Sequence, residues 1–341
     1  MSTVYFVIGP HRSGTSLVTS LLGETVGELP NNLMRPALSN QKGFQESWSI
    51  VNINDVILGE MGLKWDSPEP TNSEINKQSF VDKFKDICEK CISSCFKDLN
   101  KNIVLKDPRF CKTFPIWKSV VEKMGFQVKI IIPVRNPSEV IKSLIKRDGF
   151  TPEHACLIWY WHMTEAIIHS RGIDSKFIFY DRLLKNPQKY FNQILGIKIS
   201  DESVKKIDSS LNHASEFDFN INFITEPFNT SNLLYERILK NNSPNLDLIE
   251  DLESRYFFSL SQKFFYNIKN KTKERYLIKL IKELSGVKVQ KIRSLLNQSL
   301  CYDSESLSYY DIVLRNKNLE GVFLLKIYKA IQSIINNFTK R

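Results

Sequence analysis

The sequence lacks a hydrophobic run that is long and pure enough to cross a membrane, although 42% of its 341 residues are hydrophobic. It also lacks the start of a secretory signal, because MSTVYFVIG has no basic stretch and leads directly into a predicted strand. These absences exclude the usual membrane-spanning and secreted classes. We therefore expect a soluble, cytoplasmic protein without a transmembrane segment.

Cysteine is scarce, and its spacing does not form a zinc site. Six cysteines occupy positions 88, 91, 95, 111, 156 and 301. Cys88, Cys91 and Cys95 follow one another at helical spacing, but no second CxxC pair and no nearby histidine completes a ligand set. We predict that these three thiols lie on the core face of a helix, that the chain binds no metal, and that its compartment is reducing.

Acidic residues do not balance the basic ones. The chain has 47 Lys and Arg against 37 Asp and Glu, which gives a net charge of +10. Such a charge favours an anionic partner, either nucleic acid, a membrane surface, a polyphosphate ligand or an acidic glycan. A lysine-rich, solvated surface explains the same excess, and composition alone leaves both explanations open.

Strand and helix patterns alternate over the first two-thirds of the chain. Short apolar runs predict strands at 4–8, 102–105, 128–134 and 176–180. Amphipathic patterns predict helices between them, at 16–22, 46–61, 75–96, 115–124, 137–146 and 152–171. Alternation of this kind predicts an α/β fold with a parallel sheet flanked by helices. The loop motif described below makes the expected fold P-loop-like.

Strand patterns disappear towards the C-terminus. Residues 233–341 contain few prolines or glycines and many apolar repeats flanked by Lys and Asn. We predict an α/β domain over residues 1–230 and a helical C-terminal extension of unknown role over 231–341.

The segment GPHRSGTSLVTSLL, residues 9–22, has the glycine spacing of a phosphate-binding loop between a strand and a helix. The lysine expected after the second glycine is missing, since Thr15 and Ser16 follow it and the basic residue is Arg12. A magnesium enzyme also needs an acidic residue at a neighbouring strand end, yet VKIIIPV is followed by Arg135. The pattern predicts a nucleotide held by basic groups and backbone, without Mg²⁺.

Four motifs in this order, GPHRSGTSLVTSLL, KDPRF, PVRNPSEVIKSL and FYDRLLKNP, resemble the sulfotransferases that use 3′-phosphoadenosine 5′-phosphosulfate (PAPS). They are more similar to the bacterial and glycan-modifying branches than to the cytosolic small-molecule enzymes. The resemblance covers roughly residues 3–200 and does not extend to the last hundred residues.

The resemblance implies a set of donor-binding residues. The first loop and helix start would hold the 5′ phosphosulfate with Arg12, Ser13, Gly14, Thr15 and Ser16. Arg135 and Ser143, eight positions apart, match the pair that binds the 3′ phosphate. Tyr180 matches a tyrosine that contacts the adenine, with a half-buried residue at a strand end as the alternative.

It also implies catalytic residues. Arg12 and Lys106 would stabilise the leaving group and the sulfonyl oxygens. Cytosolic relatives carry a histidine just after this lysine, but here the next residue is Asp107. Glu46 matches the general base of glycan sulfotransferases and is our first choice, with Asp107 second. His154, His162 and His169 are predicted to serve packing or the acceptor site.

The resulting prediction is a sulfotransferase that moves a sulfuryl group from PAPS to a hydroxyl or amine of a carbohydrate or small metabolite. One alternative is a P-loop kinase of a small metabolite or nucleotide. Another is a non-catalytic basic protein that binds nucleic acid, or an anionic membrane through residues 322–341. No nucleic-acid-binding module is recognisable in the sequence. Residues 28–43, the aromatic helix around Trp159 and the C-terminal region are predicted to shape the acceptor site.

Overall fold

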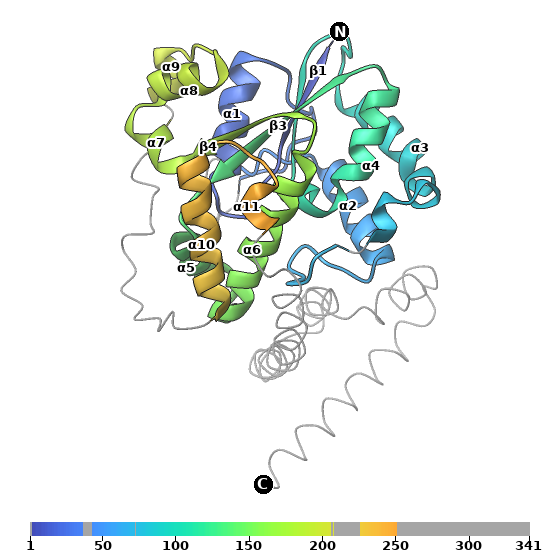
Figure 1. Cartoon of the computed structure of the whole chain (residues 1–341). Helices are drawn as coiled ribbons and strands as arrows, with labels where there is room; N and C mark the ends of the chain where they lie inside the picture. Colours follow the sequence, from blue (N-terminus) through green and yellow to red (C-terminus); the bar gives the residue numbers. More distant parts are fainter. Residues whose placement is uncertain (1, 37–42, 72, 206, 208–225, 251–341) are drawn as a thin grey trace, which may run out of the picture. The chain divides into compact units, whose positions relative to one another are not determined.

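The centre of the fold is a four-stranded sheet in which all strands run parallel (Figure 1). The computed structural model describes residues 2–36, 43–71, 73–205, 207 and 226–250. The strands lie in the order β2-β1-β3-β4 and comprise β1 (Thr3–Val7), β2 (Ile103–Lys106), β3 (Gln127–Val134) and β4 (Asp174–Phe179). The predicted α/β class, a parallel sheet flanked by helices, is confirmed.

Strand β1, which precedes the predicted phosphate loop, lies inside the sheet between β2 and β3. Its last residue, Val7, pairs with Lys106 of β2 on one side and with Ile131 of β3 on the other. Parallel strands end at the same edge, and ligands of open α/β sheets gather where the connections diverge from a central strand. The loop after β1 therefore lies between the ends of β2 and β3.

Helices surround the sheet and continue beyond it. They are α1 (Thr15–Thr25), α2 (Trp48–Glu60), the 3₁₀ turn η1 (Ser73–Asn76), α3 (Gln78–Cys95), α4 (Phe110–Lys123), α5 (Pro137–Asp148), α6 (Pro152–His169), α7 (Tyr180–Lys185), α8 (Pro187–Leu195), α9 (Asp201–Lys205), α10 (Glu226–Asn241) and α11 (Asp247–Glu250). Helices α2, α3 and α4 pack beside one another (Figure 1). Cys88, Cys91 and Cys95 are buried on α3, which confirms the predicted thiol-bearing core face.

Helix α6 is buried on all sides from His154 to Ile167. It packs against α4, α5 and α10, and its apolar residues are not confined to one face. Trp159 is fully buried and Trp161 nearly so. Burial of His154 and His162 agrees with the packing role considered for these histidines, whereas a role of the helix in the acceptor site stays a prediction.

Helix α4 begins earlier than its proline suggested. The sequence placed Pro115 at a helix start, but the helix begins at Phe110 and contains Pro115 in its interior. Proline has no N–H to donate to the carbonyl four residues earlier, which belongs to Cys111. His169 supplies the missing donor, with its Nε2 2.9 Å from the Cys111 oxygen. The predicted boundary was wrong because a tertiary contact replaces the lost helical hydrogen bond.

The C-terminal part is described only as far as residue 250. Helix α10 crosses the predicted boundary at residue 230 and packs against α6. Residues 251–341, including the proposed membrane-binding segment 322–341, lie outside the described residues. Within the described part, no helix combines the length and the apolar character needed to span a bilayer.

Candidate active site

The loop between β1 and α1 turns through two residues with left-handed backbone, Arg12 (φ 66°) and Gly14 (φ 90°). A Cβ atom on Gly14 would overlap the ring of Tyr180, so this close approach requires glycine. The buried Ser13 closes the turn by donating from its hydroxyl to the Pro10 carbonyl at 2.7 Å. Helix α1 starts at Thr15 with Gly14 as its N-cap, and its first N–H groups therefore receive no side-chain cap.

Arg12, Ser143 and Arg135 meet beside this loop. The Arg12 Nε donates to the Ser143 hydroxyl at 2.8 Å across 131 positions of sequence. The Arg135 guanidinium donates to the Arg12 carbonyl at 3.3 Å and to the Glu139 carboxylate at 2.7 Å. It also lies 4.7 Å above the centroid of the Tyr180 ring. Residues that the sequence assigned to two separate phosphate groups thus lie in one cluster.

Tyr180 is the first residue of α7, because β4 ends at Phe179, one residue earlier than predicted. Its ring covers Gly14 on one side and the Arg135 guanidinium on another. Burial raises the pKa of its hydroxyl, so the ring stays uncharged at neutral pH. In this geometry Tyr180 shapes the phosphate loop directly.

Arg147 adds a third guanidinium to the cluster, and the sequence interpretation missed it. Burial, followed by the charges of Arg147 and Arg135, lowers the pKa of Arg12 below its ordinary value. Arg147 pairs with Asp148 at 2.8 Å and lies 5.4 Å from the centroid of the Trp65 ring. It follows Ser143 by four positions on α5, a spacing that places both side chains on one helix face and could have indicated it.

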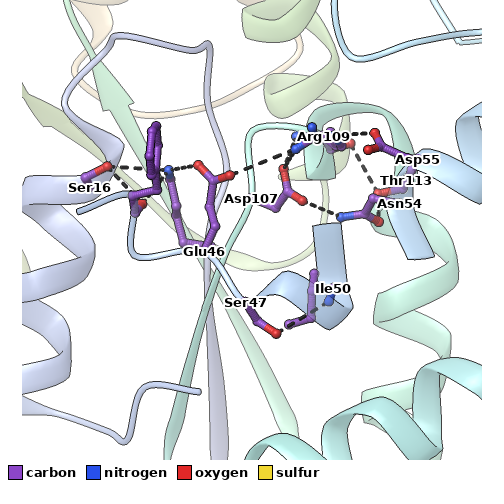
Figure 2. Close-up of polar contacts among 11 residues, drawn as sticks. Ser16, Glu46, Ser47, Ile50, Asn54, Asp55, Asp107, Arg109 and Thr113 are labelled. Carbon is purple, nitrogen blue, oxygen red and sulfur yellow. Dashed lines mark hydrogen bonds and ion pairs between the residues drawn. The ribbon is translucent and has the colours of Figure 1, made fainter. Parts of the chain in front are cut away.

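A second cluster joins the loop to the end of β2 (Figure 2). The Lys106 ammonium donates to the Glu46 carboxylate and to the Phe44 carbonyl at 2.9 Å. The Ser16 hydroxyl donates to the same carbonyl at 3.0 Å. Lys106 and Glu46 are only 3% and 7% exposed. The predicted cation, the first-choice base and the helix start are therefore neighbours.

Asp107, the second-choice base, is fully buried and engaged on both oxygens (Figure 2). Its Oδ1 accepts from the Arg109 backbone N–H at 2.9 Å and from the Arg109 guanidinium at 3.1 Å. Its Oδ2 accepts from the Asn54 amide at 2.9 Å. Asn54 is itself held from α4, because its Oδ1 accepts from Thr113 and Trp117.

Arg109 links this network to Glu46. Its NH1 lies 3.9 Å from Glu46 Oε2, and its Nε donates to Asp55 at 2.6 Å. The charges of Asp107, Asp55 and Glu46 keep the pKa of Arg109 above its ordinary value despite the opposing effect of burial. The two oxygens of Glu46 therefore face different cations, Lys106 and Arg109. The KDPRF motif carries the only sequence signal for this second cation.

His11, inside the loop, is buried against the rings of Trp65 and His162 at centroid distances of 4.7 and 5.8 Å. Burial, and to a smaller extent nearby cations, lowers the pKa of His11 well below its usual range. The ring is therefore neutral at neutral pH, and its contacts anchor the loop.

Comparison with solved structures gives matches that include two sulfotransferase domains. No family model matches the chain, and no curated protein matches it. A sulfotransferase domain from the Synechococcus PCC 7002 olefin synthase is 16% identical, with a TM-score of 0.40 over 70% of this chain and 96% of that chain. A sulfotransferase domain from the curacin biosynthetic pathway is 15% identical, with a TM-score of 0.35 over 74% and 91%. These likenesses concern the fold alone.

Proposed function

We propose that the chain is a sulfotransferase that moves a sulfuryl group from PAPS to a hydroxyl or amine of an acceptor. The observation that carries this proposal is the Arg12–Ser143 hydrogen bond with Arg135 on the Arg12 carbonyl. It joins the loop after β1 to the strand end and helix that we assign to the 3′ phosphate, and this supports a donor with phosphates at two positions. The buried Lys106–Glu46 pair at the same loop supplies a cation and a base.

The residues present fit such a donor. The uncapped start of α1 and the loop N–H groups offer donors to the phosphosulfate. Arg135 would bind the 3′ phosphate, and Arg12 and Arg147 add positive charge beside it. Ser143, now held by Arg12, would exchange this partner for a phosphate oxygen. The adenine contact of Tyr180 stays part of the proposal.

In the proposed transfer step, the site residues account for the developing charge and for the proton that is released. The acceptor oxygen forms a bond to sulfur while the bond from sulfur to the bridging oxygen breaks, and the bridging oxygen keeps the electron pair. Lys106 and Arg12 stabilise the charge on that oxygen. Glu46 takes the acceptor proton. When Lys106 turns from Glu46 towards the sulfuryl group, the Glu46 oxygen that it occupied becomes available for this proton.

Asp107 serves a different role in this scheme. Both of its oxygens are engaged by Arg109 and Asn54, and its side chain is fully buried. It holds Arg109 beside Glu46 and so acts as a positioning residue. This arrangement favours Glu46 over Asp107 as the base.

Titration with PAP, the desulfated donor, tests the proposal. Because the cations of the site belong to the protein, PAP should raise the unfolding midpoint equally with and without EDTA. At about 100 times its Kd, PAP should add roughly 2.7 kcal/mol of apparent stability. If EDTA abolishes the shift, or if ATP with Mg²⁺ gives a larger one, the kinase alternative replaces the sulfotransferase.

A further inference from the structure

Trp48 is exposed in a way that sets it apart from the other tryptophans. All five lie within the described residues, and Trp117, Trp159 and Trp161 are buried while Trp65 is partly buried. Trp48 is instead 51% exposed. Burial of the large apolar surface of an indole stabilises a core or an interface, and within the fold Trp48 makes little use of this stabilisation.

The backbone fixes Trp48 next to the candidate base. Trp48 is the first residue of α2, and Ser47 caps this helix by accepting from the Ile50 N–H. The Trp48 N–H donates to the Asn32 carbonyl at 3.2 Å, and the Glu46 carbonyl accepts from the Met34 N–H at 2.7 Å. These bonds hold residues 46–48 as one unit at the head of α2.

The exposed face of α2 continues from Trp48 along the helix. Asn52 and Asp55 follow it by four and seven positions, a spacing that puts the three side chains on one face. Asn52 is exposed, and the Asp55 side chain is 50% exposed. The opposite side of the helix is buried in the core through Ile50, Ile53 and Ile57.

This face borders the reaction centre through one side chain. Asp55 accepts from the Arg109 Nε at 2.6 Å, and the same guanidinium lies 3.9 Å from Glu46 (Figure 2). A ligand on the exposed face of α2 would therefore lie within reach of the candidate base. No other described tryptophan combines exposure with this position.

The chemistry of the face selects its ligand. Helix α2 contains no lysine or arginine, and its two charged residues, Asp55 and Glu60, are acidic. Each acid pairs with a cation of another element, Asp55 with Arg109 and Glu60 with Lys83, so the charges of this helix are compensated and do not favour an ionic ligand. The Asn52 amide and the outer edge of the Asp55 carboxylate can bind hydroxyl groups. An indole stacks on the C–H face of a saturated ring through its π system.

We propose that the α2 face formed by Trp48, Asn52 and Asp55 binds the acceptor and takes an uncharged, hydroxyl-bearing ring, the chemistry of a neutral sugar residue. The assignment rests on the proposed function, because it places the acceptor beside Glu46. The assignment also predicts that the acceptor binds to this face whether or not PAPS is bound.

Tryptophan fluorescence tests the site with the full-length protein and a panel of neutral oligosaccharides, cellotriose, maltotriose and chitotriose, with heparin as the anionic comparison. At least one neutral oligosaccharide should bind. Trp48→Ala should weaken that binding at least tenfold, measured by calorimetry because the variant loses its reporter. Trp48→Phe should restore part of it, and Asn52→Ala should weaken it several-fold. The matched control is Ile87→Ala, which removes an apolar side chain that is 52% exposed on α3 and should change nothing.

Several results would overturn the assignment. These are unchanged affinity in Trp48→Ala, binding of heparin alone, no binding by any neutral oligosaccharide, or conversion of a dimer to a monomer by Trp48→Ala in sedimentation. PAP titration of the same variants separates the two proposals. Loss of sugar binding with intact PAP binding supports both, whereas Trp48-dependent sugar binding without any PAP binding retains the site and rejects the sulfotransferase.

Discussion

Lys106 donates a hydrogen bond to the carboxylate of Glu46 although the two residues are 60 positions apart in the chain. Strand β2 ends beside the loop that follows β1, and the segment before α2 is held there because the Phe44 carbonyl accepts from both Ser16 and Lys106. Both side chains are almost completely buried, so each charge depends on the other for compensation. In the proposed function, a bound donor would separate this pair, and the two residues would then serve as cation and base.

Replacement of Glu46 by Gln should lower kcat by about 10²–10⁴-fold, the range typical for loss of a general base. The amide keeps the shape of the side chain but cannot take the acceptor proton. PAP affinity should change little, because in the proposed mechanism the carboxylate meets the acceptor and not the nucleotide. Steady-state kinetics with labelled PAPS, together with PAP titration, gives both quantities.

Asp107→Asn provides the comparison. If Asp107 only positions Arg109, this substitution should lower kcat less than Glu46→Gln does. It should lower the free energy of unfolding more, because the neutral amide holds the Arg109 guanidinium less strongly. If Asp107→Asn loses more activity than Glu46→Gln while remaining folded, Asp107 is the base.

Arg135→Ala should separate the two anion sites. The variant should bind PAP more weakly by about 1.5–3 kcal/mol, because a charge-assisted pair with the 3′ phosphate is lost. Adenosine 5′-phosphosulfate lacks that phosphate, so its affinity should change much less. Calorimetric titration of both ligands measures the difference.

Arg182→Ala is the matched control for Arg135. Arg182 also lies over an aromatic ring, that of Phe179 at 4.3 Å, but it belongs to α7 and donates to Asn242. It should leave both affinities unchanged. Equal losses for the two ligands in Arg135→Ala would show that Arg135 does not bind the 3′ phosphate.

The sequence predicted the sheet well because its strands are continuous apolar runs that end in recognisable loops. Gln127–Val134 and Pro137–Asp148 lie within a few residues of their predicted bounds, since Asn136 caps the helix and Pro137 starts it. Pro115 misled the prediction for α4, because the donor that compensates for it, His169, is 54 positions away. Local patterns contain no information about such a partner.

The positions of the candidate site residues were predictable where a motif directly follows a strand. The loop, Lys106 and Arg135 are each marked by a strand end. The hydrogen bond between Arg12 and Ser143, and the position of Arg109 between Asp107 and Glu46, depend on how separate strand ends converge. Exposure of Trp48 and burial of Trp159 could not be read from sequence either, because both lie in helices with many apolar residues.

Acid should destabilise the fold through His162. Burial, followed by the charge of Lys112, lowers the pKa of this histidine to about 3. The unfolded chain binds a proton near pH 6.5 and the folded chain does not, so the free energy of unfolding falls as the pH decreases below about 6.5. His162 should contribute a slope of up to about 1.4 kcal/mol per pH unit. Urea denaturation at pH 7, 6 and 5 measures it.

His162→Gln isolates this contribution, because glutamine does not titrate but can still donate to the Ile158 carbonyl that now accepts from His162 Nδ1. The slope should become shallower by the contribution of one histidine. An unchanged slope would assign the acid sensitivity to other groups, among them His11 and His154, whose pKa values burial also lowers.

The contact between His169 and the carbonyl freed by Pro115 should appear as an energetic coupling. His169→Phe keeps a ring against Phe114 but removes the donor to Cys111, which should cost about 1–3 kcal/mol for an unsatisfied buried carbonyl. In Pro115→Ala, the new N–H at position 115 can donate to the same carbonyl, so His169→Phe should cost less there. Urea denaturation of the wild type, both single variants and the double variant completes the cycle. Additive losses would mean that His169 does not replace the hydrogen bond that Pro115 removes.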